Sequence, residues 1–460
     1  MWHAGRWMID SEFTAPDERA GEEPAFGDGL IGVLLGGDGL RAIAALMIFF
    51  GHVFVNADPG QAFENYGWAK ELVGRLDLGL GLFFALSGYF VVRPFVRSFI
   101  LDTKRPSARR FARNRALRIV PAFYVVAAIV LLRFGLDGAI GPTPDNPSGT
   151  APRSEWWQVL SVFSFTQSYT GGSATLPYGQ AWSLNAEVAF YLLLPLGATL
   201  AYRLGGRIHT PRGRARAAVI ALGGVGLVSI YLRQGSDEFA VLTSPPMILY
   251  AFVPGIILAA AEPLAAPRLR ANPRQAKLLA YALGAVTVLA WALYAHSDYA
   301  VQTTALHHAL GRRALMAVVC ASAALAAVIV WQLATEKAPR WLDNRPIRYL
   351  GARSYAIYLI HVWVLFEVID LVGADAGTTT LVIAMIVIGL PVTVALSALS
   401  WRFVEQPFLE RRVRWAFGEP RPGPGAPVAA TGAAGATTPD EATADRSEVV
   451  QEAPPERALP

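Results

Sequence analysis

Residues 38–52 read Asp38-Gly-Leu-Arg41-Ala-Ile-Ala-Ala-Leu-Met-Ile-Phe-Phe-Gly51-His52, an apolar run that carries one cation and one imidazole. The surrounding apolar block, from about 33 to 55, has the roughly 20 residues that a helix needs to cross about 30 Å of hydrocarbon. Ionisable side chains are costly inside a bilayer and therefore mark candidate functional groups. The stretch predicts a transmembrane helix that carries part of a site.

Nine further apolar blocks of similar length follow in this chain of 460 residues. Backbone polar groups in lipid must be satisfied within the chain, so each block is expected to be helical. The predicted fold class is all-α, a polytopic transmembrane helical bundle of about ten spans. The spans are predicted at 33–55, 77–98, 117–134, 183–203, 216–233, 246–262, 277–295, 313–333, 354–373 and 379–402.

Composition and charge support this class. The chain is 53% hydrophobic and 16% charged, whereas a soluble domain usually carries about 25% charged residues. The net charge of +5 does not indicate a nucleic-acid partner, because Arg and Lys cluster in alternate connections between apolar blocks. By the positive-inside rule, both termini are expected in the cytoplasm and the partner surface is the bilayer of the plasma (inner) membrane.

Three regions follow from these patterns. Residues 1–31 are polar, lack the features of a signal peptide, and are predicted to be a cytoplasmic segment. Residues 32–412 form the predicted transmembrane domain. Residues 418–460 are rich in Pro, Ala, Gly, Thr and acidic residues, so they are predicted to form a disordered cytoplasmic tail.

Arg41 and His52 are eleven residues apart in the first span. At about 100° and about 1.5 Å per residue they share one helical face and lie about 16 Å apart along the axis. That separation is comparable to an extended pantetheine arm, so an anionic donor head at Arg41 could place its thioester at His52. The alternative is an interfacial arginine that snorkels, together with a histidine bonded to a neighbouring helix.

Other polar groups also accompany the spans. Arg115 and Arg118 share a face at i,i+3 and suit phosphate recognition, although a topology signal or contact with anionic lipid is an alternative. The remaining candidates lie in or beside later spans. They are Trp182, Ser183 and Glu187 at the fourth span, Ser354, Tyr358 and His361 on one face of the ninth, and Glu405 after the tenth. The alternative is an ordinary interfacial carboxylate for Glu187 and interhelical bonding for the face of the ninth span. No metal site or ATP-binding loop is evident in the sequence.

The motifs together resemble a known family. They are Asp38-Gly-Leu-Arg41 with His52, Gly79-Leu-Gly-Leu-Phe83-Phe84-Ala-Leu-Ser87-Gly88-Tyr89, Arg115-Ala-Leu-Arg118, Trp182-Ser183-Leu-Asn-Ala-Glu187, Ser354-Tyr355-Ala-Ile-Tyr358-Leu-Ile-His361 and Phe403-Val-Glu405-Gln-Pro407. In this order they resemble the acyltransferase 3 family of integral membrane O-acyltransferases, and the chain looks like a stand-alone member without the appended hydrolase-like domain of other members.

The resemblance implies specific roles. His52 matches the family's catalytic histidine, Arg41 its partner, and Glu405 the acidic residue of the closing motif. Arg115 and Arg118 match the motif tied to donor binding. The implied co-substrate is a cytoplasmic acyl-CoA, with no other cofactor, and acetyl is the expected acyl group.

The predicted function is acyl transfer from acyl-CoA to a hydroxyl of a glycan, lipid or other cell-envelope or secondary-metabolite acceptor. In the mechanism that we expect, neutral His52 removes the hydroxyl proton as a general base. A covalent acyl-histidine is a second route that the sequence does not distinguish. The rival function is a transporter or flippase for an anionic substrate, because it would also use arginines and an intramembrane histidine.

Overall fold

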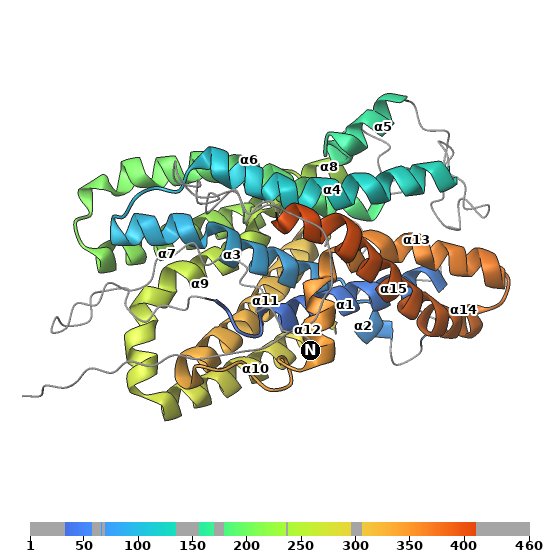
Figure 1. Cartoon of the computed structure of the whole chain (residues 1–460). Coiled ribbons are helices and arrows are strands. Elements are labelled where there is room, and N and C mark those ends of the chain that lie inside the picture. The colour runs from blue at the N-terminus through green and yellow to red at the C-terminus, as the bar shows by residue number, and fades with distance from the viewer. Residues whose placement is uncertain are drawn as a thin grey trace, which may run out of the picture. The chain divides into compact units, whose positions relative to one another are not determined.

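The structure is a computed structural model that describes residues 33–57, 66, 70–134, 156–169, 179–235, 238–295 and 306–410 (Figure 1). These ranges contain helices and no strand. The predicted segments 1–31 and 418–460 lie outside them. The α-helices are α1 Gly37–Ala57, α2 Lys70–Val73, α3 Leu78–Leu101, α4 Ala108–Phe134, α5 Trp156–Phe163, α6 Trp182–Leu204, α7 Pro211–Arg233, α8 Phe239–Leu242, α9 Pro245–Ala271, α10 Pro273–Ala295, α11 Leu306–Thr335, α12 Arg345–Ala352, α13 Ser354–Val372, α14 Thr378–Ala384 and α15 Leu390–Ser400.

Within the described ranges, ten helical segments are long and apolar enough to cross a membrane. They match the ten predicted spans one by one, which confirms the predicted fold class of a multi-pass helical membrane protein. The tenth segment, Thr378–Glu410, joins α14 and α15 through a π-helical turn, Met385–Gly389, and continues into a second one, Trp401–Glu405.

Helix α4 begins before the predicted start of the third span. Apolar residues begin near 117, whereas α4 begins at Ala108, so the arginine-rich segment is part of the helix. The reason is that arginine and alanine are good helix formers, and a helix can continue beyond the hydrocarbon into the polar interface. Arg115 and Arg118 therefore project from a continuous helix.

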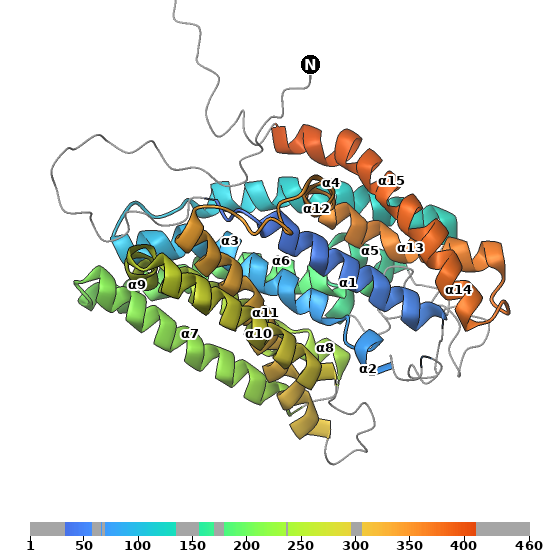
Figure 2. The same ribbon diagram turned by 90° about the horizontal axis from the view of Figure 1, so that it is seen from below.

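Helix α1 lies between α3 and α13 (Figure 2). Helix α3 also packs closely against α9, where a Cβ at Gly255 would overlap the carbonyl oxygen of Ala85, and one at Gly88 would overlap that of Phe252. Small residues allow such close approach of two membrane helices. This contact fixes α3, which forms a wall of both cavities described below.

A buried ion pair joins α3 to α9. The Arg93 guanidinium donates to both carboxylate oxygens of Glu262 at 2.8 and 2.9 Å, and the Tyr89 hydroxyl donates to the same carboxylate at 3.0 Å. All three side chains are buried. A buried charge needs such partners, because its desolvation in an apolar interior is expensive.

Consecutive spans alternate in direction. The start of α1, the end of α3, the start of α4 and the end of α6 therefore share one end of the bundle, which we call the arginine end. The start of α3, the start of α6 and the ends of α7 and α10 share the opposite end. The positive-inside rule predicts that the arginine end faces the cytoplasm.

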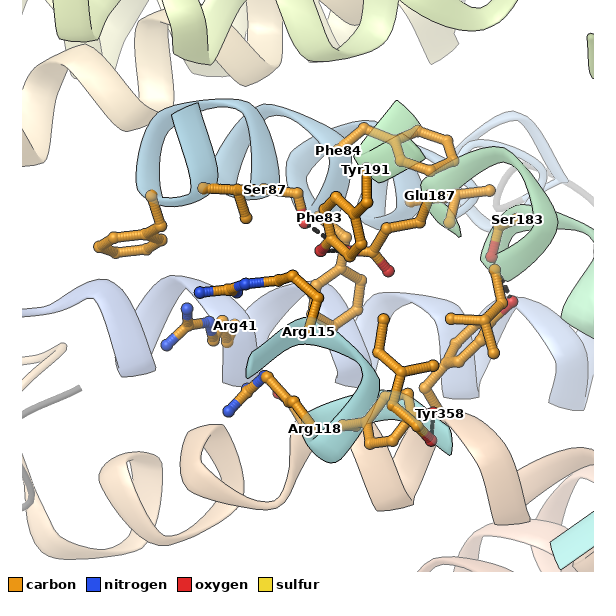
Figure 3. A pocket seen from close by; sticks show the side chains of 17 residues that line it. Arg41, Phe83, Phe84, Ser87, Arg115, Arg118, Ser183, Glu187, Tyr191 and Tyr358 are labelled. Carbon is orange, nitrogen blue, oxygen red and sulfur yellow. Dashed lines mark hydrogen bonds between the residues drawn. The ribbon is translucent and has the colours of Figure 1, made fainter. Parts of the chain in front are cut away.

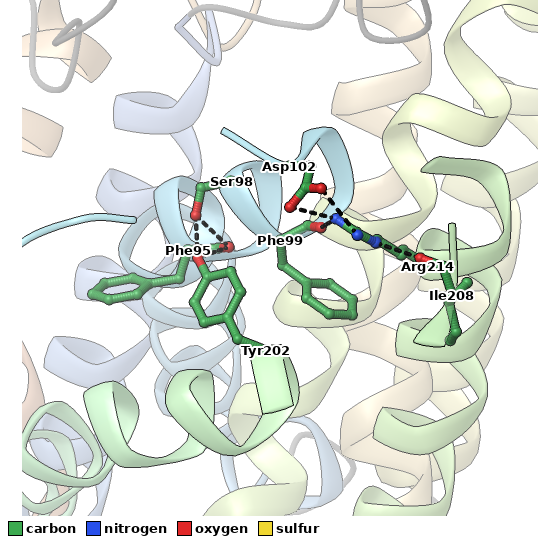
Figure 4. Close-up of polar contacts among 7 residues, drawn as sticks. All are labelled: Phe95, Ser98, Phe99, Asp102, Tyr202, Ile208 and Arg214. Carbon is green, nitrogen blue, oxygen red and sulfur yellow. Dashed lines mark hydrogen bonds and ion pairs between the residues drawn. The ribbon is translucent and has the colours of Figure 1, made fainter. Parts of the chain in front are cut away.

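A polar cluster ties α3 to α7 at the arginine end (Figure 4). Arg214 forms an ion pair with Asp102 at 2.9 Å and donates to the carbonyl oxygens of Phe99 at 3.1 Å and Ile208 at 2.7 Å. The neighbouring guanidinium holds the pKa of the Asp102 carboxyl below its usual range. The cluster stabilises the C-terminal end of α3, where the capping residue Asp102 adopts a positive φ of 55°.

Candidate active site

A cavity of about 100 Å³ lies between α1, α3, α4, α6 and α13 (Figure 3). Seven residues predicted from the sequence line it: Arg41, Arg115, Arg118, Ser183, Glu187, Ser354 and Tyr358. They come from four helices that are far apart in the chain. The cavity is much smaller than the roughly 300–1,000 Å³ of a typical small-molecule pocket, so it suits a narrow part of a ligand.

Three guanidinium groups gather at one end of this cavity (Figure 3). Arg41 forms an ion pair with Asp38 at 3.1 Å, and its guanidinium lies over the Phe90 ring at 4.6 Å. The guanidinium of Arg115 is 5.9 Å from the ring centroid of Tyr191. Arginines that stack on aromatic rings keep their planar faces fixed and present their N–H groups to anions. This end is therefore suited to phosphate groups.

Glu187 provides a negative charge in the same cavity. One of its carboxylate oxygens accepts hydrogen bonds from the Ser87 hydroxyl, at 2.7 Å, and from the Tyr191 hydroxyl. Ser87 belongs to α3, whereas Glu187 and Tyr191 belong to α6. The carboxylate therefore joins two walls of the cavity and orients the tyrosine ring next to Arg115.

Hydroxyl groups gather at the other end of the cavity. The Ser183 and Tyr358 hydroxyls are 2.6 Å apart, and the Tyr358 hydroxyl also donates to the carbonyl oxygen of Gln180. Because Tyr358 donates to that carbonyl, Ser183 is the donor in the first bond. The chain of bonds fixes α13 against the start of α6 and leaves the Tyr358 ring as part of the cavity wall.

Beyond Tyr358, two histidines form a pair. Nε2 of His361 lies 3.3 Å from Nδ1 of His52, and the ring centroids are 4.9 Å apart. His361 is buried, whereas His52 is partly exposed. Neither side chain lines the cavity itself, but the Tyr358 ring, which does, lies 5.9 Å from the His361 ring.

The backbone determines which ring nitrogens carry protons. Nδ1 of His361 lies 2.8 Å from the carbonyl oxygen of Tyr358, and Nδ1 of His52 lies 2.9 Å from that of Ile48. A carbonyl oxygen can only accept, so both Nδ1 atoms are donors in the neutral rings. The single Nδ1–H of His52 is then shared between the Ile48 carbonyl oxygen and Nε2 of His361, and Nε2 of His52 keeps its lone pair. This is the protonation state that a general base requires.

Two predicted site residues lie elsewhere. Glu405 is buried at the end of the tenth span, where it interacts electrostatically with Arg118 and Arg353. Gly389 packs near Phe49 of α1, and Glu405 follows it by sixteen residues, roughly 24 Å of helix. Glu405 thus lies near the arginine end and not beside His52. Trp182 lines a second cavity on the other side of Phe84.

Several residues of the site were absent from the predicted set. Ser87 and Tyr191 bind the Glu187 carboxylate, and Arg93 and Glu262 form the buried ion pair behind α3. Both members of that pair are ionisable residues inside apolar blocks, a signal that would have identified them from the sequence. Their pairing depends on the packing of α3 against α9, which the sequence does not reveal.

The fold and the site define a multi-pass membrane protein whose bundle holds an elongated, cationic cavity with a histidine pair beyond its far end. A family model described as "Acyltransferase domain" matches residues 35–402, most of the chain. The chain therefore belongs to the acyltransferase 3 family, which confirms the resemblance inferred from its motifs.

Curated relatives have consistent names. The chain is 27% identical over 377 residues to "Putative peptidoglycan O-acetyltransferase YrhL" of Bacillus subtilis, covering 80% of this chain and 54% of that protein. It is 25% identical over 386 residues to "Peptidoglycan O-acetyltransferase OatA" of Listeria monocytogenes, covering 80% of this chain and 55% of that protein. The chain spans little more than half the length of these relatives. No solved structure matches it.

Proposed function

We propose that this protein is an O-acetyltransferase of the plasma membrane, with both termini in the cytoplasm. It moves an acetyl group from a cytoplasmic acetyl-CoA to a hydroxyl of a cell-envelope glycan. The family membership supports acyl transfer, and the names of the relatives support acetyl and a peptidoglycan-type acceptor. The observation that carries the proposal is the placement of the three arginines and His52. The arginines lie at one end of the cavity, and His52 lies beyond the other end, on the same helix as Arg41.

The arginine end supports an anionic donor. Arg41, Arg115 and Arg118 contribute three positive charges to the cavity lining, against one negative charge from Glu187. The phosphates of CoA can bind guanidinium groups through charge-assisted hydrogen bonds. The cavity is too narrow for the nucleotide part of CoA. The nucleotide therefore stays outside the cavity at the arginine end, and only the pantetheine arm enters the cavity.

The separation of Arg41 and His52 along α1 is comparable to the length of an extended pantetheine arm. Arg41 and His52 lie on one face, about 16 Å apart along the axis. A thioester carried by an arm anchored at Arg41 can therefore arrive near the histidine pair. Tyr358 and Phe83, whose ring centroids are 6.4 Å apart, form the wall along the last part of the path.

In the proposed step, Nε2 of His52 removes the proton from the acceptor hydroxyl as its oxygen attacks the thioester carbonyl. The C–S bond then breaks, and the His52 imidazolium returns the proton to the departing CoA thiolate, which gives free CoA and the acetyl ester. His361 accepts from Nδ1–H of His52 throughout and so stabilises the imidazolium. General bases of this kind contribute about 10²–10⁴-fold to rate.

A deletion strain complemented with variants tests this proposal. Wild-type protein should restore O-acetyl groups on envelope glycans, measured by mass spectrometry, and His52→Ala should not. His209→Ala is the matched control, because His209 is an exposed histidine in the connection before α7. Full acetylation by a normally inserted His52→Ala protein would remove His52 from the mechanism.

The same preparations separate an enzyme from a transporter of anionic substrates. Membranes with wild-type protein should release free CoA from acetyl-CoA when glycan acceptor is present. A transporter would move substrate without consuming the thioester. Accumulation of acetyl-CoA inside vesicles, with no free CoA, would favour the transporter.

A further inference from the structure

A second and larger cavity lies at the end of the bundle opposite the arginines. It has a volume of about 280 Å³ and is enclosed by α3, α9 and α11, with contributions from the ends of α6, α7 and α10. Polar and aromatic side chains share its wall: Arg75, Asp77, Arg233, Trp182, Tyr250 and Tyr294.

The two cavities follow one another along α3. Residues of α3 and of the segment just before it, from Arg75 to Phe84, line the second cavity. Residues of α3 from Leu80 to Val91 line the first cavity. Leu80 and Phe84 line both cavities, so these two side chains form the partition between them. Figure 3 shows Phe84 at the edge of the first cavity. A group in the second cavity is thus separated from the donor path by two side chains.

The partition lies on the arginine side of His52, because Gly51 of α1 packs against Leu76, which precedes Leu80 and Phe84. Gly79, next to Leu80, packs against Ala44, Met47 and Ile48 of α1. Ile48 precedes His52 by four residues, about 6 Å along the axis. Ala44 precedes His52 by eight residues, so a hydroxyl that passes the partition enters the donor path about 6–12 Å along the axis from His52.

Hydrogen bonds hold the polar side chains of this cavity in place. Nε of Arg75, which is only 2% exposed, donates to the carbonyl oxygen of Tyr294 at 2.8 Å, and the Tyr294 hydroxyl donates to Asp77 at 2.9 Å. Arg233 donates to the carbonyl oxygen of Leu242 at 2.8 Å and lies over the Tyr250 ring at 5.5 Å. The groups are therefore fixed before any ligand arrives.

The aromatic rings of this cavity can stack on the C–H faces of a sugar, and the oriented charged groups beside them can bind its hydroxyls. The volume is near the lower limit of small-molecule sites, about 300 Å³, which suits a single sugar ring rather than a folded polymer. We propose that the second cavity binds a sugar ring of the glycan acceptor, with one hydroxyl directed between Leu80 and Phe84 toward His52. This inference rests on the proposed acetyltransferase function.

A binding measurement tests the site independently of catalysis. The purified full chain in detergent is titrated with chitotetraose, an N-acetylglucosamine tetramer, and ligand-induced stabilisation against heat gives the affinity. Asp77→Asn and Trp182→Ala should each weaken binding by about tenfold, the effect of losing one good contact. Asp77→Asn is nearly isosteric, so it remains informative if removal of the indole impairs folding.

Matched controls use the same residue types at the arginine end. Asp343→Asn and Trp341→Ala change exposed side chains outside both cavities and should bind chitotetraose like wild type. No binding by wild type, or equal affinity in the cavity variants, would overturn the sugar site. Binding that behaves as expected without any release of CoA from acetyl-CoA would instead contradict the acetyltransferase proposal.

Discussion

The substitution His361→Phe tests whether the second histidine positions the first. Phenylalanine keeps an aromatic ring of similar size in the buried space between α13 and α1, but it removes the acceptor atom 3.3 Å from Nδ1 of His52. The Nδ1–H group of His52 then retains only the carbonyl oxygen of Ile48, at 2.9 Å. His52 stays in place but loses the partner that stabilises its imidazolium form.

The size of the effect follows from the lost bond. A hydrogen bond to a charged group contributes about 1.5–3 kcal/mol, and every 1.36 kcal/mol of activation free energy is tenfold in rate. This bond strengthens when His52 becomes protonated in the transition state, so the loss appears in kcat. Because the Ile48 carbonyl remains, we expect the lower part of the range, a kcat about tenfold below that of wild type.

The assay is steady-state transfer from radiolabelled acetyl-CoA in membranes. KM for acetyl-CoA should stay unchanged, since the arginines lie about 16 Å away. His361→Gln is the rescue variant, because its amide oxygen can accept from His52 and should restore part of kcat. An unchanged kcat in His361→Phe would refute the positioning role. A raised KM together with a lowered kcat in both variants would indicate general disruption instead.

Three further substitutions test the donor site and the packing. Arg118→Ala should raise KM for acetyl-CoA about tenfold with little change in kcat, because a charge-assisted phosphate contact is lost; an unchanged KM would separate Arg118 from donor binding. Arg93→Met should lower stability by about 3–5 kcal/mol, because the buried Glu262 carboxylate loses the guanidinium that binds both of its oxygens; a thermal unfolding midpoint equal to that of wild type would contradict this. Gly255→Ala should reduce the yield of monodisperse protein in size-exclusion chromatography, since its methyl group overlaps the Ala85 carbonyl, and a normal yield would show that α3 and α9 can separate.

The sequence by itself determined the class of protein and predicted a direction for each span. Ten apolar blocks of membrane-spanning length can satisfy their backbone groups only as helices, and the structure has a span at each of them. Local periodicity also placed Arg41 and His52 on one face, because 3.6 residues per turn is a property of every α-helix. The motif order identified the family.

Only the tertiary structure decided which helices face one another. His52 and His361 are 309 residues apart, and their contact depends on how α1 packs against α13. The position of Glu405 far from His52 likewise follows from packing of the tenth span. Helix periodicity repeats within a single element and carries no information about the neighbour across an interface. The partition at Leu80 and Phe84, shared by both cavities, exists because five or more helices converge around α3.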